Sequence, residues 1–357
     1  MRTLGLTLLS LAAALAAGAG LMAAVGIDPV TAYRELGLGG LGTPRNVAET
    51  LLRFCPLALC ALAVAVGFRA SFFTIGVEGQ FYFGALGTAL AALAFPGLPP
   101  LILIPAAMAA GMAAGAVWGL LAGWLKVRFG VNEVIGTLML NYIAVLFVQY
   151  LLRGPIRAPG SEVQFTPLIP AAAMLPRVVP WARLSWGIAV PFLAGYAVQV
   201  FQRRTWAGFR AQAFGANPLA ARYAGISGSR SVLVVTAVSG ALAGLAGALV
   251  VQGEFHRLQA GIGADYGYTA IPIALVGQTN PAGTLVTAFL FAAMDVGATM
   301  MQLKAAVPLP MVRLLEGLMI LFVVGGRMVL SAGLGRRVAA HLRPVSPPAV
   351  PPAAPQP

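Results

Sequence analysis

The chain has 357 residues, of which 59% are hydrophobic and 9% are charged, and its formal net charge is +13. In a soluble domain roughly a quarter of all residues are charged, so this composition leaves too little polar surface for a water-soluble fold. Apolar runs of membrane-spanning length recur along the chain without the alternation of an outer-membrane barrel. Most of the basic residues lie between these runs, where orientation signals belong, which argues against a nucleic-acid partner.

The apolar runs predict an all-α polytopic membrane protein with about ten transmembrane helices. The N-terminal run has the basic start and apolar middle of a signal peptide, but its length and the many later spans favour a first transmembrane helix. The span at 267–277 is too short to cross a bilayer by itself. In chain order the predicted spans are 4–25, 47–67, 72–95, 99–125, 132–152, 185–202, 231–252, 267–277, 281–302 and 309–326.

The charge distribution predicts the orientation. An even number of spans places both termini on one side, and with the N-terminus inside, cytoplasmic segments such as 203–230 contain arginine but no acid. The opposite segments mix basic and acidic residues. An excess of Lys and Arg belongs in the cytoplasm, so we expect both termini there, in a bacterial inner membrane.

Three regions organise the chain. Residues 1–46 contain the first helix and an external segment, and residues 47–330 form the membrane core with its longest cytoplasmic loop at 203–230. Residues 331–357 end in the Pro-rich sequence "PVSPPAVPPAAPQP". Such a composition cannot pack, so this tail is expected to be extended and disordered.

Two segments have the composition of broken helices. Glycines surround Glu78 in "FFTIGVEGQFYFGALG" (72–87), and glycines and Pro272 follow Asp265 in "GIGADYGYTAIPIALVGQTNP" (261–281). Non-helical backbone at membrane depth is tolerated only when it is buried in protein or lines a cavity. Paired interruptions in two halves of a chain indicate an inverted repeat around a central pathway.

Polar residues inside the spans form stripes. Glu133, Thr137 and Asn141 follow an i, i+4, i+8 spacing, which places them on one helix face. The triplet Thr74, Glu78 and Tyr82 has the same spacing, and Asp295 and Thr299 form an i, i+4 pair. Charged groups in lipid are costly, so these stripes are expected to face the bundle interior.

Two interpretations of the stripes remain open. They line a translocation pathway, or they join helices and stay hydrated near the interface. Arg313 and Glu316 are spaced i, i+3 in the last span, which predicts a local ion pair. The pathway candidates are Glu78, Tyr82, Asn132, Glu133, Thr137, Asn141, Tyr142 and Asp295.

Signatures of enzymatic chemistry are missing from the sequence. The two lysines, Lys126 and Lys304, do not belong to a Gly-rich phosphate-binding loop. Cys55 and Cys60 lie in one apolar run, and their spacing fits neither a zinc site nor a disulfide framework. We therefore expect a non-catalytic membrane protein without metal or cofactor: a transporter, a channel or a membrane subunit of a larger assembly.

The segment 205–230 contains a helix with clear start and stop signals. Asn217 is a good N-cap, Pro218 suits the first helical position, and Gly225 would end a helix over 218–223. A short capped helix on a cytoplasmic loop, with no partner in its own chain, is typical of a docking element. The alternative is an amphipathic helix on the membrane surface, but the segment is short and has small side chains.

Three segments resemble the permeases of ATP-binding-cassette (ABC) importers for nucleosides and simple sugars: "GVEGQFYFGALG", "GVNEVIGTLMLNYIA" and "AFGANPLAARYAGI". The second segment resembles the longer of the two permease types in nucleoside importers. The resemblance covers roughly residues 45 to 330 and implies a ten-helix fold similar to that of the vitamin B12 importer permease. It also implies a coupling helix that docks on the ATPase, with the positions Gly215, Asn217, Pro218, Ala220, Ala221, Tyr223 and Gly225.

The partners implied by the resemblance are ABC ATPase subunits, a second and shorter permease in a heterodimer, and an external substrate-binding protein or lipoprotein. ATP hydrolysis in the partner then drives alternating access. A nucleoside would suit Tyr82, Asn141 and Tyr142, because aromatic rings stack on bases and Asn bonds base edges. The alternatives are a sugar or branched-chain amino acid permease of the same architecture, an ion-coupled secondary transporter, and a scaffold that transports nothing.

Overall fold

A computed structural model describes the backbone of residues 2–179, 181–305, 307–308, 310–312, 314–315, 317–318, 321–322 and 325, and side chains from residue 12 onward. The chain forms two compact units, one of residues 1–26 with 309–357 and one of Ile27–Pro308. The Arg313–Glu316 pair and the Pro-rich tail lie outside the described residues.

The unit of the chain ends is helical where it is described. Helix α1 spans Arg2–Ala24 and agrees with the first predicted span. All described residues between 310 and 325 are also helical, as expected for the last span.

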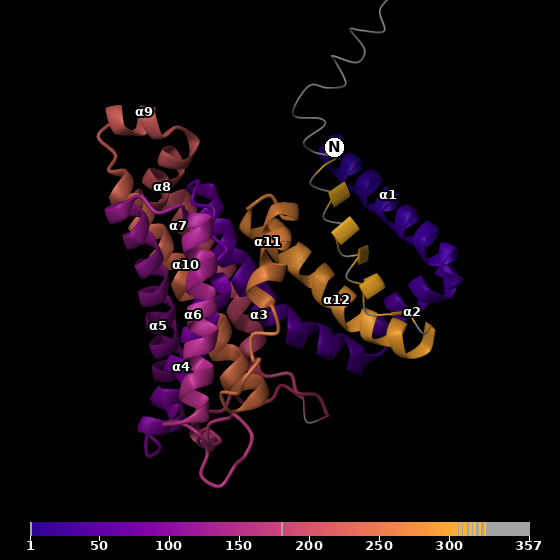
Figure 1. Ribbon diagram of the computed structural model, residues 1–357, viewed down its shortest axis with the longest axis horizontal. Coiled ribbons are helices and arrows are strands. Elements are labelled where there is room, and N and C mark those ends of the chain that lie inside the picture. Colours follow the sequence, from indigo (N-terminus) through magenta and orange to yellow (C-terminus); the bar gives the residue numbers. More distant parts are fainter. Residues whose placement is uncertain are drawn as a thin grey trace, which may run out of the picture. The chain divides into compact units, whose positions relative to one another are not determined.

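The unit Ile27–Pro308 is a bundle of helices (Figure 1). Proline at the first helical position or an Asn, Thr or Ser N-cap begins most of them, as at Pro44, Asn132 and Ser227. The helices are α2 (Pro29–Leu41), α3 (Pro44–Arg69), α4 (Val77–Ala94), α5 (Pro100–Phe129), α6 (Glu133–Arg153), α7 (Ala189–Arg204), α8 (Trp206–Ala216), α9 (Pro218–Tyr223), α10 (Gly228–Val250), α11 (Tyr266–Val276) and α12 (Pro281–Ala305).

Short helical turns complete these elements. Two 3-10 turns, η1 (Ala171–Ala173) and η2 (Trp186–Ile188), precede α7, and a π-helical turn, η3 (Val251–Phe255), extends α10. In the part of the chain that the structure describes, β-type pairing is limited to the isolated bridges Phe165–Gln259 and Arg177–Ser185.

Five helices are long and apolar enough to cross a membrane among the described residues: α3, α5, α6, α10 with its π-helical extension, and α12. The protein is therefore a helical, multi-pass membrane protein. The apolar faces of α3 and α10 are largely buried, whereas α5 and α6 leave most of theirs exposed. Helices α3 and α10 thus form the centre of the bundle, and α5 and α6 lie at its periphery.

Glycines bring α4, α5 and α10 into close contact. Gly111, Gly115, Gly119 and Gly123 repeat every four residues on α5 and face α4 and α10. A Cβ on Gly115 would overlap the Gly240 carbonyl oxygen, and one on Gly84 would overlap Gly244. Small residues allow membrane helices to approach closely, and van der Waals packing then replaces the hydrophobic effect as the source of association.

The structure departs from the predicted elements in four places. Helix α2 lies between the first two predicted spans, and α8 precedes the predicted helix 218–223 in the loop 203–230; neither α2 nor α8 was expected. The predicted span 72–95 begins as a helix only at Val77, so Thr74 does not share a helix with Glu78 and Tyr82, and the expected triplet is wrong. Helix α7 begins four residues after its predicted start, behind the turn η2.

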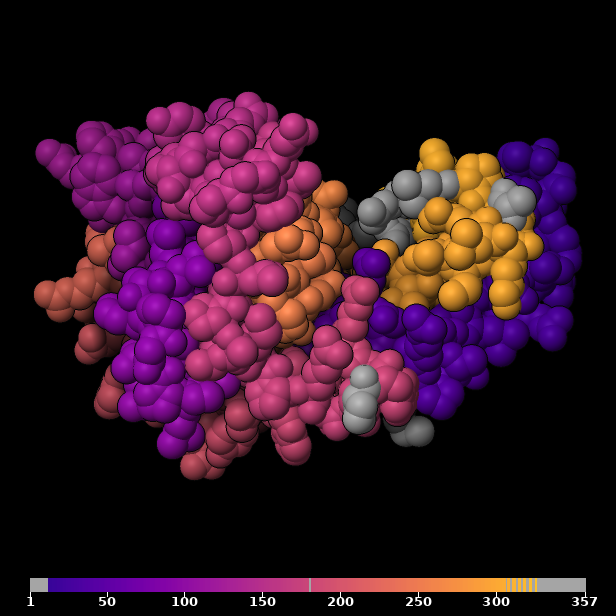
Figure 2. Space-filling model, turned by 90° about the horizontal axis from the view of Figure 1, so that it is seen from below, coloured from indigo at the N-terminus to yellow at the C-terminus, as the bar shows by residue number. Residues whose placement is uncertain are grey.

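The segment 256–265 connects η3 to α11 in a non-helical conformation and pairs with the loop between α6 and α7. Backbone N–H groups of Thr166 and Ile169 donate to the carbonyls of Leu258 and His256, each at 2.9 Å, and Ala260 N–H donates to Gln164 at 3.1 Å. In Figure 2 the magenta to pink atoms of the α6–α7 connection lie against orange atoms of this later region. The loop therefore holds the segment that leads to α11.

Candidate functional site

The two predicted broken segments meet inside the bundle. The Glu78 side chain, on the first turn of α4, accepts the Gly267 N–H through Oε2 at 2.7 Å. The Tyr82 hydroxyl accepts the Gly263 N–H at 3.3 Å. Glu78 and Tyr82 are both buried, and a Cβ on Gly267 would overlap the Glu78 backbone nitrogen. Glycine is therefore required for the start of α11 to reach α4.

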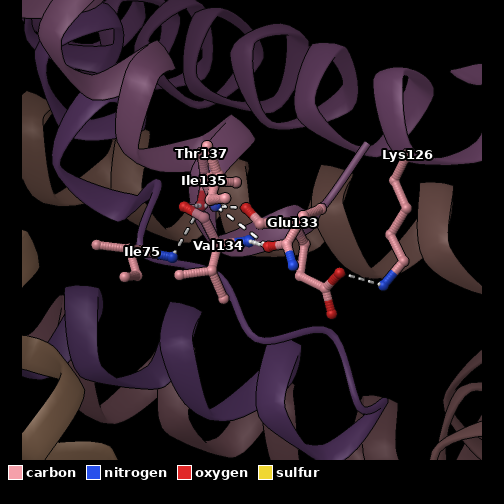
Figure 3. Close-up of polar contacts among 7 residues, drawn as sticks. Ile75, Lys126, Glu133, Val134, Ile135 and Thr137 are labelled. Atoms are coloured by element: carbon pink, nitrogen blue, oxygen red, sulfur yellow. Dashed lines mark hydrogen bonds and ion pairs between the residues drawn. The ribbon is translucent and has the colours of Figure 1, made fainter. Parts of the chain in front are cut away.

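The buried part of the α6 stripe supports the break before α4. Asn141 Oδ1 accepts the Gly79 N–H at 2.8 Å, and Asn141 Nδ2 donates to the Ile75 carbonyl at 2.8 Å. Thr137 Oγ1 accepts the Ile75 N–H at 3.1 Å, as Figure 3 shows. Backbone groups without partners are costly in a membrane, so these two side chains replace the missing helical hydrogen bonds.

The N-terminal end of the same stripe, at the start of α6, lies at the edge of the bundle. Asn132 caps α6 by accepting the N–H groups of Val134 and Ile135. Glu133 pairs with Lys126 of α5 at 2.8 Å, and Figure 3 shows this pair apart from the contact of Thr137 with Ile75. Glu133 is partly exposed, in agreement with the interpretation that it stays hydrated near the interface.

The predicted pathway residues thus separate into two groups. The structure brings Glu78, Tyr82, Thr137 and Asn141 together around the two breaks, whereas Tyr142 lies exposed on α6. Sequence reasoning missed Tyr268 of α11, whose hydroxyl lies 3.3 Å from Asn141 Nδ2. We call this group of residues, with Gly263 and Gly267, the polar junction.

Asp295 belongs to a second polar contact. Its Oδ2 lies 2.5 Å from a guanidinium nitrogen of Arg53 on α3, and the two side chains are 33% and 40% exposed. Thr299, which was expected to face the interior with Asp295, is exposed in this chain. The sequence did contain a signal for Arg53, because it is the only basic residue inside the span 47–67 and Asp295 is the only charged one in 281–302.

Helix α9 forms the tip of the loop between α7 and α10. Asn217 caps it by accepting the N–H groups of Leu219 and Ala220, each at 3.0 Å. Gly225 has a positive φ of 76° and ends the helix, in agreement with the predicted stop signal. Ala221 is buried, while Leu219 and Tyr223 are 67% and 92% exposed. The helix therefore presents a tyrosine and a leucine to the outside.

The base of this loop contacts the end of α3. Ser71 Oγ donates to the Gly215 carbonyl at 2.7 Å, and Arg69 donates to Gln202 of α7 at 2.7 Å. A Cβ on Gly215 would overlap the Arg69 carbonyl oxygen. Because the break before α4 begins at Ser71, the loop and the polar junction are separated by only a few residues of backbone.

These features define a multi-pass helical membrane protein with a buried polar junction and an exposed helical loop outside its spans. Among the described residues, no group of three or more His, Cys, Asp and Glu side chains could hold a metal ion. The family described as the permease component of branched-chain amino acid transport systems matches residues 46–324. The chain belongs to this family of transport permeases.

Several curated relatives resemble the chain over most of its length. It is 34% identical to the glucose ABC transporter permease protein TsgB13 of Haloferax volcanii, over 90% of this chain and 87% of that protein. It is also 34% identical to the guanosine ABC transporter permease protein NupP of Bacillus subtilis, over 88% and 91%. The nucleoside ABC transporter permease protein NupB of Lactococcus lactis is 32% identical, over 86% of each chain.

Proposed function

We propose that this chain is a permease subunit of a bacterial inner-membrane ABC importer that translocates a nucleoside, with ATP hydrolysis performed by a separate ATPase. The family and the guanosine and nucleoside permeases among its relatives support this proposal. The observation that carries it is the contact of the α8–α9 loop with the end of α3, next to the break before α4.

In this proposal the ATPase docks on α9, which contains the coupling positions Pro218, Ala220, Ala221 and Tyr223 between Asn217 and Gly225. Movement of α9 reaches Gly215 and then Ser71, because Ser71 donates a hydrogen bond to the Gly215 carbonyl. Residues 71–76 are not helical and are held by side chains of α6, so the polar junction is the place where a shift of the loop would alter the bundle.

The polar junction is proposed as part of the translocation pathway. Both ends of the Asn141 amide already bond within the chain, so we assign Asn141 and Thr137 to positioning the break rather than to solute contact. Tyr82 and Tyr268 supply aromatic rings on which a base can stack, and Glu78 holds the start of α11.

The remaining assembly follows from the same proposal. The chain would contain ten transmembrane helices with an inverted repeat, as in the vitamin B12 importer permease, and both termini would be cytoplasmic. A shorter second permease would complete a heterodimer, and an external substrate-binding protein or lipoprotein would deliver the solute. The exposed apolar faces of α5 and α6 are available to lipid or to such a partner.

A simple sugar is the second candidate substrate. It is favoured by the relative named as a glucose permease, which is as similar to this chain as the guanosine permease is. A nucleoside contains a sugar, so one polar pathway is chemically suited to either class.

ATP-dependent uptake by the complete assembly tests the proposal. The chain is reconstituted in proteoliposomes with its genomic-neighbour ATPase, second permease and receptor, and uptake of labelled nucleosides and sugars is measured. A Leu219→Asp, Tyr223→Asp double variant alters only exposed side chains of α9, so we expect normal folding but at least a tenfold loss of uptake. Val163→Asp, at an exposed position of the α6–α7 loop, is the matched control and should transport normally.

The outcomes distinguish the alternatives. ATP-dependent nucleoside uptake that is lost only in the α9 variant supports the proposal. Uptake of a sugar alone would support the assignment as an importer but show that the substrate is a sugar and not a nucleoside. Uptake that follows a proton gradient and ignores both ATP and the α9 substitutions would contradict the importer assignment.

A further inference from the structure

A cavity of about 280 Å³ lies between α8 and the first turns of α10, beside the loop that contains α9. Arg210 of α8 and Arg230 of α10 are among its lining residues, and both are exposed, so the cavity has a basic residue on each of two elements. Its lining residues are Ala207, Arg210, Gly225, Ser227, Arg230, Ser231 and Val234.

The charge of this cavity is not balanced within the described chain. Neither Arg210 nor Arg230 forms an ion pair with an acid among the described residues. The sequence contains no Asp or Glu from residue 163 to residue 253, so no carboxylate is available from the neighbouring chain segments. Guanidinium groups are suited to bidentate hydrogen bonds with phosphate oxygens. The cavity therefore has the charge and donors to bind an anion.

The position of the cavity along α10 indicates where that anion comes from. Helix α10 begins at Gly228 and the predicted span at residue 231, so Arg230 directly precedes that span and is expected at the depth of lipid headgroups. Trp206, Phe209 and Arg210 share an i, i+3, i+4 face of α8, and the two aromatic side chains are exposed. Exposed aromatic residues next to the end of a span are typical of the membrane interface. Val234, also exposed, adds an apolar wall one turn further along α10.

The walls of the cavity are fixed by local contacts. Ser227 caps α10 by accepting the Arg230 N–H at 3.4 Å, and Ser231 Oγ donates to the Ser227 carbonyl at 3.0 Å. Phe214 of α8 packs directly on Gly228, where a Cβ would touch its ring. Helix α8 is therefore held close to the start of α10.

We propose that this cavity binds the phosphate headgroup of an anionic phospholipid, with Arg210 and Arg230 as its cationic ligands and Trp206 and Phe209 at the interface beside it. Basic pockets at the ends of membrane helices are a general solution for holding such headgroups. The site adjoins Gly225 at the end of α9, so a bound lipid would contact the same loop that carries α9. This inference does not depend on the identity of the transported solute.

Lipid binding to the purified full-length chain tests the proposal. The protein in non-ionic detergent is titrated with phosphatidylglycerol or phosphatidylcholine, and bound lipid is counted by native mass spectrometry. We expect at least tenfold tighter binding of phosphatidylglycerol to the wild type. The Arg210→Gln, Arg230→Gln double variant should lose this preference, while Arg204→Gln, Arg222→Gln removes the same charge outside the cavity and should retain it.

A second variant separates loss of the binding site from misfolding of the double arginine variant. Ala207→Glu places a carboxylate in the cavity and leaves both arginines present, and it should also abolish the preference. Unchanged phosphatidylglycerol binding in both cavity variants overturns the proposal, as does an equal loss in the Arg204, Arg222 control. Competition by millimolar inorganic phosphate without any preference for the lipid would assign the cavity to a soluble anion and overturn the lipid assignment.

Discussion

Asn141 bonds two backbone groups on opposite sides of the start of α4, the N–H of Gly79 and the carbonyl of Ile75. Its side chain is fully buried, and both backbone groups belong to a segment where the helical pattern is incomplete. An amide side chain offers a donor and an acceptor on two separate atoms, so it can bond both groups at once. Asn141 therefore satisfies, from another helix, the groups that the break leaves free.

Asn141→Ala should destabilise the protein and weaken transport. The change leaves the Gly79 N–H and the Ile75 carbonyl without these partners, and each unsatisfied buried group costs about 1–3 kcal/mol. Thermal unfolding in detergent, followed by size-exclusion chromatography of heated samples, measures the effect. Tyr142→Ala on the same helix removes an exposed ring and should cost less than ~0.5 kcal/mol. Equal loss in the two variants would mean that the backbone contacts of Asn141 do not matter.

At the scale of elements, α2 and α12 are packed through glycine. A Cβ on Gly40 would overlap the Ala293 carbonyl oxygen, and one on Gly297 would overlap the Leu36 carbonyl oxygen. Lys304 and Glu35 add an ion pair between the same two helices at 3.0 Å. Helix α2 is thus attached to a membrane span and is not a free connection.

Two glycines of α2 provide a matched pair of substitutions. Gly40→Ala inserts a methyl group against backbone that cannot move aside, and overpacking of this kind costs about 1–3 kcal/mol. Gly37→Ala has no atom within 4 Å of the new Cβ and should stabilise α2 by roughly 0.5–1 kcal/mol. Melting temperatures of the two variants should move in opposite directions, and a fall of equal size in both would contradict the α2–α12 packing.

The elements that the sequence predicted well are those whose signals are local. The apolar length of α3 or α12, and the Asn217–Pro218 start and Gly225 stop of α9, can be read from neighbouring residues. Helix α2 was missed although Asp28 and Pro29 form the same kind of start signal as Asn217 and Pro218, because its sequence is rich in glycine; Gly39 and Gly40 are explained only by their contact with α12. The late start of α4 was not predicted, because the non-helical segment before it is stabilised by hydrogen bonds to Thr137 and Asn141, about sixty residues away in the sequence.

The candidate site shows the same limit. Glu78, Thr137 and Asn141 were selected correctly as buried polar residues, because charged and amide groups in apolar spans are unusual. Their partners were not predictable, since Gly267 and Ile75 contribute backbone groups that leave no mark on side-chain patterns. The role of each residue in transport stays a prediction.

At the scale of the whole Ile27–Pro308 unit, α3 connects the regions described above. Arg53 pairs it with Asp295 of α12. At its end Arg69 donates to Gln202 of α7, and Ser71, just beyond the helix, donates to the Gly215 carbonyl at the base of the loop. Helix α3 also packs on α10 and α11. A displacement of α3 would therefore alter each of these contacts.

A double-mutant cycle at Arg53 and Asp295 measures the link between α3 and α12. Arg53→Ala or Asp295→Ala leaves one charge unpaired inside a span, and with partial exposure we expect a loss of about 1–3 kcal/mol for each. The exchange Arg53→Asp, Asp295→Arg should recover part of that loss. Additive losses in the Arg53→Ala, Asp295→Ala double variant, measured by thermal unfolding, would show that the two side chains are not coupled.

The pairing of segment 256–265 with residues 164–169 has a consequence for biosynthesis. Helix α11 is too short to integrate as an independent span, and the segment before it is not helical. The groups that hydrogen-bond this segment and the start of α11, among them Glu78, Tyr82 and Thr166, lie earlier in the chain and leave the ribosome first. When segment 256–265 is synthesised, the partners of its backbone groups are therefore already present in the chain, and they satisfy hydrogen-bonding groups that lipid could not.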